Sequence, residues 1–280
     1  MRVRAHSSLL LRFSPLLGPT CAFLRPLSMA SAAGDGCCPP GSHGAPPAFD
    51  AKPDGIFLNV GKDTPCYYVA PSNASNKAMI LFPDIWGLKS RIVKISDWLA
   101  QQASCHVLVC DCFRGETKDD HADMKKWFLS VPYEPNIASD VTACVDYLEK
   151  EKQVASFGAM GFCWGNWAIG KTCQFQAVPW KVAVCPHPSF KVENMFGGGD
   201  IEVMQSIACP VLMMPAGNDP PYLRPNSKEF KAMPHKLSKS VPFEEMKHGW
   251  TTRGDMTDPK MKRDVEAALQ ETLKFIKQHL

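Results

Sequence analysis

The stretch from Val154 to Cys173, VASFGAMGFCWGNWAIGKTC, constrains the fold of this chain most. A short apolar run ends in Gly161-Phe-Cys163-Trp-Gly165 and continues as a plausible helix, so the pattern predicts a strand, a sharp turn and a helix. The two glycines leave room for a strained backbone that lifts the Cys163 side chain clear of the sheet. A helix N-terminus behind Cys163 favours a thiolate, and the N–H of Trp164 can face a developing oxyanion. Cys163 is a candidate nucleophile, and a buried core cysteine is the competing interpretation.

Composition limits the classes of protein to consider. The chain has 280 residues, of which 45% are hydrophobic and 21% charged, as expected for one large globular domain. A net charge of +3 is slight, so we expect no nucleic-acid partner, and no apolar run is long enough to span a membrane. The twelve cysteines are irregularly spaced and include no C-x-x-C pair. We therefore expect free thiols in a reducing compartment, with no metal and no cofactor.

The first 48 residues differ from the rest of the chain. They hold no acidic residue before Asp35, while arginines at 2, 4, 12 and 25 lie among serines and leucines. This composition is typical of a mitochondrial presequence. A secretory signal is the alternative, but Arg12 and Arg25 interrupt the apolar stretch that such a signal needs.

A second possible start and a linker follow. Met29 opens the sequence Met-Ala-Ser-Ala-Ala, so initiation there yields a cytoplasmic form without the basic segment. Residues 34 to 55 are rich in glycine and proline, which indicates a linker. We expect residues 1–48 to be a targeting segment and linker outside the fold, and residues 49–280 to form the domain.

From Gly55 onward, short apolar runs alternate with amphipathic stretches. This alternation predicts an α/β fold with a mostly parallel sheet and helices on both faces. A last helix is expected to begin at Pro259, with Asp258 as its cap. Its predicted buried stripe is Val265, Leu269, Leu273 and Ile276. The expected strands lie near residues 66–70, 78–83, 106–110, 154–160, 181–185, 210–215 and 241–246.

Two chemically informative residues follow later strands. Asp219 comes after the run 210–215, and His248 comes after the run 241–246. Ligands gather at the carboxyl ends of strands in such a sheet, so both side chains are expected near Cys163. The chain order nucleophile, acid, histidine is the order used by α/β-hydrolases. These residues predict a triad of Cys163, His248 and Asp219.

Several short motifs make the resemblance more specific. The chain resembles a eukaryotic member of the dienelactone hydrolase family, whose members are carboxymethylenebutenolidase-like enzymes of the α/β-hydrolase fold. The resemblance covers about residue 37 to the C-terminus. It is carried by Cys-Cys-Pro-Pro-Gly-Ser at 37–42, Asp-Ile-Trp-Gly at 84–87, Asp-Cys-Phe-Arg-Gly at 111–115, Gly-Phe-Cys-Trp-Gly at 161–165, His-Pro-Ser at 187–189 and His-Gly-Trp-x-x-Arg at 248–253.

The resemblance implies roles for individual residues. It implies that Cys163 is the nucleophile, His248 the base and Asp219 the residue that orients the base. It also implies that the backbone N–H groups of Ile85 and Trp164 form the oxyanion hole.

Other positions follow from the same resemblance. Asp84 stands where bacterial members have a glutamate that contacts the catalytic thiol, and it is one methylene shorter. Asn166 stands where the family usually has a second glycine, and we interpret it as structural. Arg253 matches a family arginine, and its fork suits a substrate carboxylate. Arg114 and His187 each follow a strand; we expect Arg114 to assist in substrate binding, with a surface ion pair as the alternative, and His187 to line the pocket.

The predicted activity is hydrolysis of lactones or activated carboxylic esters by acyl transfer to Cys163. Two alternatives stay open. One is a thioesterase or general carboxylesterase, and the other is a catalytically silent hydrolase-fold protein that binds a small ligand. The expected partner is a small-molecule ester or lactone, with no nucleic acid and no membrane. We expect a monomer or a weak homodimer.

Overall fold

The computed structural model describes residues 36–47 and 52–280. The strands are β1 (Ile56–Val60), β2 (Thr64–Val69), β3 (Lys77–Phe82), β4 (His106–Cys110), β5 (Ser156–Gly161), β6 (Val182–Pro186), β7 (Val211–Met214) and β8 (Lys239–Ser240). The α-helices are α1 (Ile92–Ala103), α2 (Met124–Ser130), α3 (Ala138–Lys152), α4 (Trp164–Gln174), α5 (Asp200–Gln205), α6 (Lys228–Lys231), α7 (Trp250–Arg253) and α8 (Pro259–His279). Short helical turns are η1 (Gly87–Lys89), η2 (Lys118–Asp120), η3 (Tyr133–Ile137), η4 (Phe190–Phe196) and η5 (Pro221–Leu223).

The strands form one mostly parallel sheet, as predicted. Within the described part of the chain, their order is β1-β2-β4-β3-β5-β6-β7-β8. Only the pairs β1–β2 and β2–β4 are antiparallel, and each pair from β4–β3 to β7–β8 is parallel. The carboxyl ends of β3, β5, β6 and β7 therefore meet at one edge of the sheet, where the loops that follow them are brought together.

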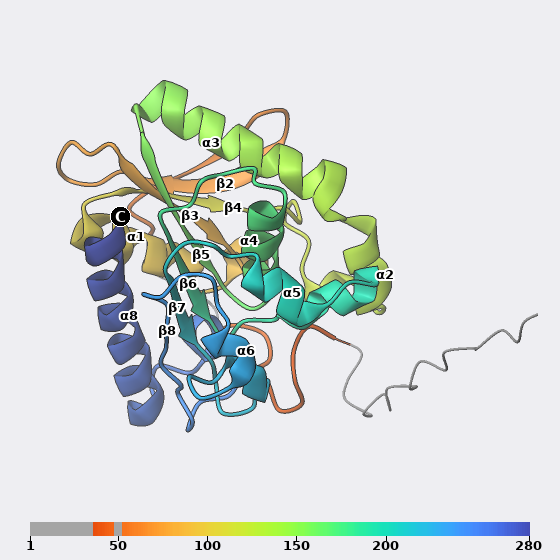
Figure 1. Ribbon diagram of the computed structural model, residues 1–280. Helices are drawn as coiled ribbons and strands as arrows, with labels where there is room; N and C mark the ends of the chain where they lie inside the picture. Colours follow the sequence, from red (N-terminus) through yellow and green to blue (C-terminus); the bar gives the residue numbers. More distant parts are fainter. Residues whose placement is uncertain (1–35, 48–51) are drawn as a thin grey trace, which may run out of the picture. The chain divides into compact units, whose positions relative to one another are not determined.

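Alternate side chains of the central strands face two separate apolar cores. On β3, Ala78, Ile80 and Phe82 belong to the core that contains α3 and α4, whereas Met79 and Leu81 belong to the core that contains α1 and α8. Figure 1 shows α3 and α8 on opposite sides of the sheet. A strand buried on both faces reads as a continuous apolar run, which is why the sequence located β3 well.

The two ends of the sheet differ from the prediction. Strand β1 was not predicted, because at this edge Ile56 and Phe57 stay more than half exposed, at 57% and 59%, so the strand lacks a buried apolar run. The strand expected at 241–246 is wrong. Only Lys239–Ser240 pairs with β7, and beyond it a single bridge joins Phe243 to Ala216. On either side of Pro242, the N–H groups of Val241 and Phe243 still donate to the carbonyl oxygens of Met213 and Pro215, each at 2.8 Å, so this segment follows β7 without forming a regular strand.

The last helix begins as predicted. Helix α8 starts at Pro259, and the Asp258 carboxylate accepts a hydrogen bond from the N–H of Lys260 at 2.9 Å. The buried stripe is only half right, because Leu269 and Leu273 are half-buried at its border. The buried face instead runs through Met261, Asp264, Val265, Ala268, Thr272, Phe275 and Ile276.

The linker predicted before the domain is wrong for residues 36–47, which we call the strap. Cys37 is buried, and the N–H of His43 donates to the carbonyl oxygen of His248 at 2.9 Å. The Asn218 side chain donates to the carbonyl oxygen of Pro40 at 3.0 Å. The strap is thus part of the folded unit, because these bonds fix it over the strand ends. Residues 1–35, and with them the predicted presequence and the Met29 start, lie outside the described residues.

The turn between β5 and α4 has the geometry that its two glycines predict. Cys163 has φ 53° and ψ −112°, a strained conformation for a residue with a Cβ. A Cβ on Gly161 would lie 2.6 Å from the backbone of Gly165, and a Cβ on Gly165 would lie 2.2 Å from the carbonyl oxygen of Phe82. Glycine is required at both positions because α4 starts in close contact with β3 and β5.

Replacing Gly165 by alanine therefore tests this close contact. We expect Gly165→Ala to lower the free energy of unfolding by about 1 to 3 kcal/mol, the usual cost of overpacking, in a urea titration. Gly44→Ala is the control, because a Cβ there meets nothing within 4 Å. Equal stability of both variants would contradict the packing described above.

Candidate active site

The predicted acid and base lie together in the two loops that follow β7 and β8. Nδ1 of His248 lies 2.6 Å from Oδ1 of Asp219, and both side chains are buried. The other carboxylate oxygen of Asp219 accepts from the N–H of Ala216 at 2.7 Å. The N–H of His248 donates to the side-chain oxygen of Asn218 at 2.7 Å. Asp219 is thus held by its own turn and orients the imidazole ring.

Ser189 joins the candidate base to the candidate nucleophile. Its Oγ lies 3.4 Å from Nε2 of His248 and 3.5 Å from Sγ of Cys163. Its N–H donates to the carbonyl oxygen of Cys163 at 3.0 Å. Among the described residues, no direct hydrogen bond links Cys163 to His248, so the serine hydroxyl bridges them. The sequence analysis noticed His-Pro-Ser only as a family motif and gave Ser189 no role.

The strap brings two further thiols to Cys163. Sγ of Cys163 lies 3.6 Å from Sγ of Cys37 and 3.7 Å from Sγ of Cys38. Cys37 and Cys163 are buried, and Cys38 is half-buried. These three sulfur atoms are close enough together to hold one metal ion. The motif Cys-Cys-Pro-Pro-Gly-Ser was visible in the sequence, but spacing alone could not place it beside a residue more than a hundred positions away.

Burial and charge act against each other at this site. Burial lowers the pKa of His248, but the thiols of Cys163 and Cys38 and the Asp219 carboxylate together raise it well above its usual value. Hydrogen bonds with Cys163 and Cys37 hold the pKa of the Cys38 thiol well below its usual range, while the same kind of bond raises the pKa of Cys37. The cluster of the three thiols and His248 therefore favours one thiolate beside a protonated histidine.

The predicted oxyanion hole has two available donors. Within the described residues, neither the N–H of Ile85 nor that of Trp164 donates a hydrogen bond to a protein group. Trp164 is the first residue of α4, whose N–H has no partner within the helix. Ile85 is fixed by the turn after β3, in which the N–H of Gly87 donates to the carbonyl oxygen of Asp84 at 3.0 Å.

The Asp84 carboxylate is engaged by other groups, and among the described residues no hydrogen bond links it to the thiol of Cys163. One carboxylate oxygen accepts from the N–H of Trp86 at 2.9 Å, and the other accepts from the hydroxyl of Thr252 at 2.6 Å. The shorter aspartate side chain thus stays with its own loop and with α7. Its contacts hold the turn that presents the N–H of Ile85.

Arg253 pairs with Asp84 and holds the strap, whereas a contact with a substrate carboxylate was expected. Its Nε lies 3.3 Å from Oδ2 of Asp84, and its Nη1 donates to the carbonyl oxygen of His43 at 2.8 Å. Its Nη2 lies 3.9 Å from Sγ of Cys38. Burial raises the pKa of Asp84, and the positive charge of Arg253 opposes that rise without cancelling it. The attraction between the two groups therefore offsets only part of the cost of burying the carboxylate.

The remaining two predicted substrate contacts also have internal partners. Arg114 forms the ion pairs that were the alternative interpretation, because its guanidinium pairs with Asp140 at 2.8 Å and Asp63 at 3.2 Å. His187 is buried rather than lining an open pocket. Its Nε2 lies 2.6 Å from the Thr251 hydroxyl, and its ring meets the His248 ring edge-on at 5.0 Å between centroids. Burial lowers the pKa of His187 well below its usual value, so this neighbour is neutral.

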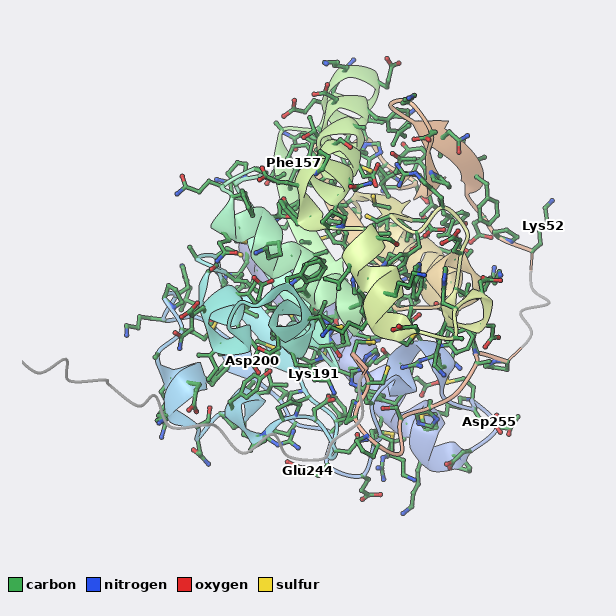
Figure 2. The ribbon with its side chains drawn as sticks, turned by 90° about the vertical axis from the view of Figure 1, so that its right-hand side faces the viewer. Lys52, Phe157, Lys191, Asp200, Glu244 and Asp255 are labelled. Carbon is green, nitrogen blue, oxygen red and sulfur yellow. The ribbon has the colours of Figure 1, made fainter. Side chains whose placement is uncertain are left out.

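A hollow adjoins the strap at the strand-end edge of the sheet. It has a volume of about 420 Å³ and is lined by His43, Gly44, Ala45, Pro47, Arg253, Asp255, Asp258 and Met261. Asp255 lines this hollow, and Figure 2 shows Asp255 and Glu244 at the opposite end of the molecule from Phe157. Because Phe157 is near the start of β5, the hollow is on the side where the parallel strands end. A larger hollow of about 920 Å³ is lined by residues such as Ala138, Thr142 and Tyr147 of α3 and includes none of the candidate site residues.

The fold and these residues together define a class. A thiol at a strand-to-helix elbow, with an acid and a histidine on later loops of a mostly parallel sheet, is the arrangement of an α/β-hydrolase. The chain belongs to the dienelactone hydrolase family, whose model matches residues 65–280. It therefore belongs with hydrolases of ester bonds.

Two curated relatives match parts of the chain. An uncharacterised AIM2 family protein of Schizosaccharomyces pombe is 26% identical over 226 residues, which are 74% of this chain and 85% of the relative. An endo-1,3;1,4-beta-D-glucanase of Zea mays is 30% identical over 115 residues, which are 40% of this chain and 37% of the relative.

Solved structures share the fold at low sequence identity. A Klebsiella pneumoniae protein whose name assigns it to the same family is 16% identical, covers 82% of this chain and all of its own, and has a TM-score of 0.55. Est1E of Butyrivibrio proteoclasticus is 14% identical, with 80% and 99% coverage and a TM-score of 0.53. A cold-adapted esterase from an Arctic metagenomic library is 15% identical, with 81% and 93% coverage and a TM-score of 0.56. In the described residues of this chain, no helix is both long and apolar enough to cross a membrane.

The pairing of Asp84 with Arg253 yields a prediction about stability. Asp84→Asn leaves the buried charge of Arg253 without its partner, and Arg253→Met does the same to Asp84. Each substitution should therefore lower the free energy of unfolding by about 3 to 5 kcal/mol. The double variant should lose at least about 1 kcal/mol less than the sum of the single losses, because the two groups interact.

Urea titrations of the four proteins measure this coupling. Asp146→Asn is the control: it breaks an exposed pair with Lys150 at 2.8 Å and should change stability by less than about 0.5 kcal/mol. Strictly additive losses at positions 84 and 253 would mean that the two side chains act independently.

Proposed function

We propose that the chain hydrolyses lactones and activated carboxylic esters through an acyl thioester on Cys163. The observation that carries this proposal is the position of Cys163. The cysteine lies at the strained start of α4, directly before the N–H of Trp164 and beside the bridge from Ser189 to His248. A nucleophile, a base with its orienting acid and an oxyanion site are the parts that acyl transfer needs.

The proposed reaction has two steps. The Cys163 thiolate attacks the carbonyl carbon, a C–S bond forms, and the electron pair displaced onto oxygen is stabilised by the N–H groups of Ile85 and Trp164. Collapse breaks the C–O bond, and the His248 imidazolium gives its proton to the leaving oxygen. Water then attacks the thioester while His248 accepts a proton, and the C–S bond breaks to release the acid and the thiolate.

The nucleophile determines which leaving groups are suitable. A thiolate whose parent thiol has a pKa of about 8.5 leaves more readily than an alkoxide, because an alcohol is a far weaker acid than a thiol. The tetrahedral intermediate of a simple alkyl ester therefore returns to reactants. A phenol, with a pKa of about 10, competes better with the thiol, and an enol resembles a phenol in acidity. Enol lactones and aryl esters are thus the favoured substrates.

Access to the site requires the strap to move. Cys163 and His248 are both fully buried, at 0% exposure. Cys38 and the carbonyl oxygen of Cys37 lie next to them, because Ser189 donates to that carbonyl. An ester carbonyl can therefore reach the thiol only when the strap shifts. The hollow beside His43 and Arg253 lies along the strap, so it is the proposed path of entry.

The name of the maize relative suggests glycoside hydrolysis, but the site does not favour it. That chemistry normally uses two carboxyl groups on either side of a glycosidic bond. Here Asp219 lies behind the His248 ring, and Asp84 is engaged by Trp86, Thr252 and Arg253. Both carboxylates already have protein partners, so the site is better suited to acyl transfer.

A substrate panel on the full chain tests the proposal. Enol lactones and aryl esters should turn over at least about tenfold faster than matched alkyl esters, because of the leaving-group difference. Cys163→Ala should lower kcat/KM by at least about a thousandfold, as is typical for loss of a nucleophile. Cys209→Ala, at a half-buried thiol outside the site, is the control.

Three outcomes would contradict the proposal. Retention of most activity by Cys163→Ala would remove the cysteine from the mechanism. Turnover of thioesters without turnover of enol lactones or aryl esters would indicate the thioesterase alternative. A lack of turnover across the panel, together with saturable binding of the same compounds, would indicate the catalytically silent alternative.

A further inference from the structure

The three thiols at the site form a nearly equilateral triangle. The Sγ–Sγ distances are 3.6 Å between Cys37 and Cys38, 3.6 Å between Cys37 and Cys163, and 3.7 Å between Cys38 and Cys163. The reaction proposed above uses only one of these sulfur atoms. The other two thiols pack against the nucleophile and have no role in that reaction.

We propose that Cys37, Cys38 and Cys163 form a binding site for a thiophilic divalent metal ion of the Zn²⁺ class, and that occupancy of this site blocks the nucleophile. Each thiol that binds gives its proton to solvent, and no electron is transferred.

The distances between the sulfur atoms fit this class of metal. Zinc binds cysteine sulfur at about 2.3 Å in a tetrahedron, and two ligands at that distance lie about 3.8 Å apart. The three measured separations are within about 0.2 Å of this value. Thiolates are also the ligands that select Zn²⁺ and other thiophilic ions over hard cations such as Mg²⁺. The site therefore needs little rearrangement to accept the metal.

The strap holds two of the three ligands in place. The carbonyl oxygen of Cys37 accepts from the Ser189 hydroxyl, and the carbonyl oxygen of Pro40 accepts from Asn218 at 3.0 Å. The carbonyl oxygen of His43 accepts from Arg253 at 2.8 Å. The thiols are thus positioned by the folded protein, and a metal ion would not have to order a free segment.

Nearby charges suit three thiolates around a divalent ion. The complex carries one net negative charge, and the guanidinium of Arg253 lies 3.9 Å from Sγ of Cys38. Cys38 is half-buried, so water can reach the cluster and supply the fourth ligand of a tetrahedron.

Cobalt provides a direct probe of the site, because Co²⁺ bound by thiolates in a tetrahedron gives strong charge-transfer absorption. Reduced full-length protein is titrated with Co²⁺, and Zn²⁺ is then added. We expect thiolate-to-cobalt bands that saturate at one ion per chain and disappear when Zn²⁺ replaces Co²⁺. Competition with a chromogenic chelator gives the Zn²⁺ affinity.

Variants locate the site. Cys37→Ser and Cys38→Ser should each weaken Zn²⁺ binding at least about a hundredfold, since loss even of groups that only support metal ligands costs 10- to 100-fold. Cys209→Ser should bind Zn²⁺ as the unmodified protein does, because its thiol is outside the cluster. Circular dichroism checks that each variant is folded, and the cobalt spectrum of the unmodified protein does not depend on any variant.

Hydrolysis provides a second readout, which rests on the proposed function. One equivalent of Zn²⁺ should abolish ester turnover, and a chelator should restore it. In Cys38→Ser, inhibition relative to the variant's own metal-free rate should need at least about a hundredfold more Zn²⁺.

The two proposals fail in different ways. The absence of thiolate-to-cobalt bands, or equal Zn²⁺ affinity in Cys37→Ser, Cys38→Ser and Cys209→Ser, overturns the metal site. Bands that depend on Cys37 and Cys38, with no inhibition of a turnover that Cys163→Ala abolishes, overturn the claim that the metal blocks the nucleophile. Turnover that survives in Cys163→Ala instead overturns the proposed function.

Discussion

The close contact between the start of α4 and strands β3 and β5 is the constraint on which the site depends. It exists because Gly161 and Gly165 carry no Cβ, and it forces Cys163 into a strained conformation. That conformation costs about 1 to 3 kcal/mol, which the two apolar cores around the sheet must offset. The same conformation places the thiol at the N-terminus of α4, beside the N–H of Trp164. The same packing therefore explains both the local strain and the candidate reactivity.

The strap adds a second constraint, because it completes the site and also closes it. Its bonds to Asn218, His248 and Arg253 join the first described residues to the loops after β7 and β8 and to helix α7. Arg253 connects the strap to Asp84 and so to the turn that presents Ile85. A shift of the strap thus changes the environment of Arg253 at the same moment that it exposes Cys163. Opening of the site and its electrostatics are coupled through this one side chain.

Much of the fold and part of the site could be predicted from the sequence. Central strands such as β3 are buried on both faces and read as apolar runs, and the elbow needs two glycines that the sequence shows. Edge strand β1 is exposed, and β8 ends before Pro242, so neither matches a simple pattern. The protein partners of Asp84, Arg253 and Arg114 could not be predicted, because charged side chains pair across distant segments, which spacing does not reveal. The role of the strap was missed for the same reason, since composition alone made it resemble a linker.

The central claim, that an acyl group is carried on Cys163, can be tested at the level of a peptide. Full-length protein is mixed with an aryl ester, quenched in acid during turnover, digested with trypsin and examined by mass spectrometry. The tryptic peptide spanning residues 153–171 contains Cys163 and no other cysteine, so its modification identifies the residue. The account predicts the mass of the acyl group on this peptide during turnover and its loss as the substrate is consumed. An acyl group on the peptide that carries Cys37 and Cys38, with peptide 153–171 unmodified throughout turnover, would contradict it.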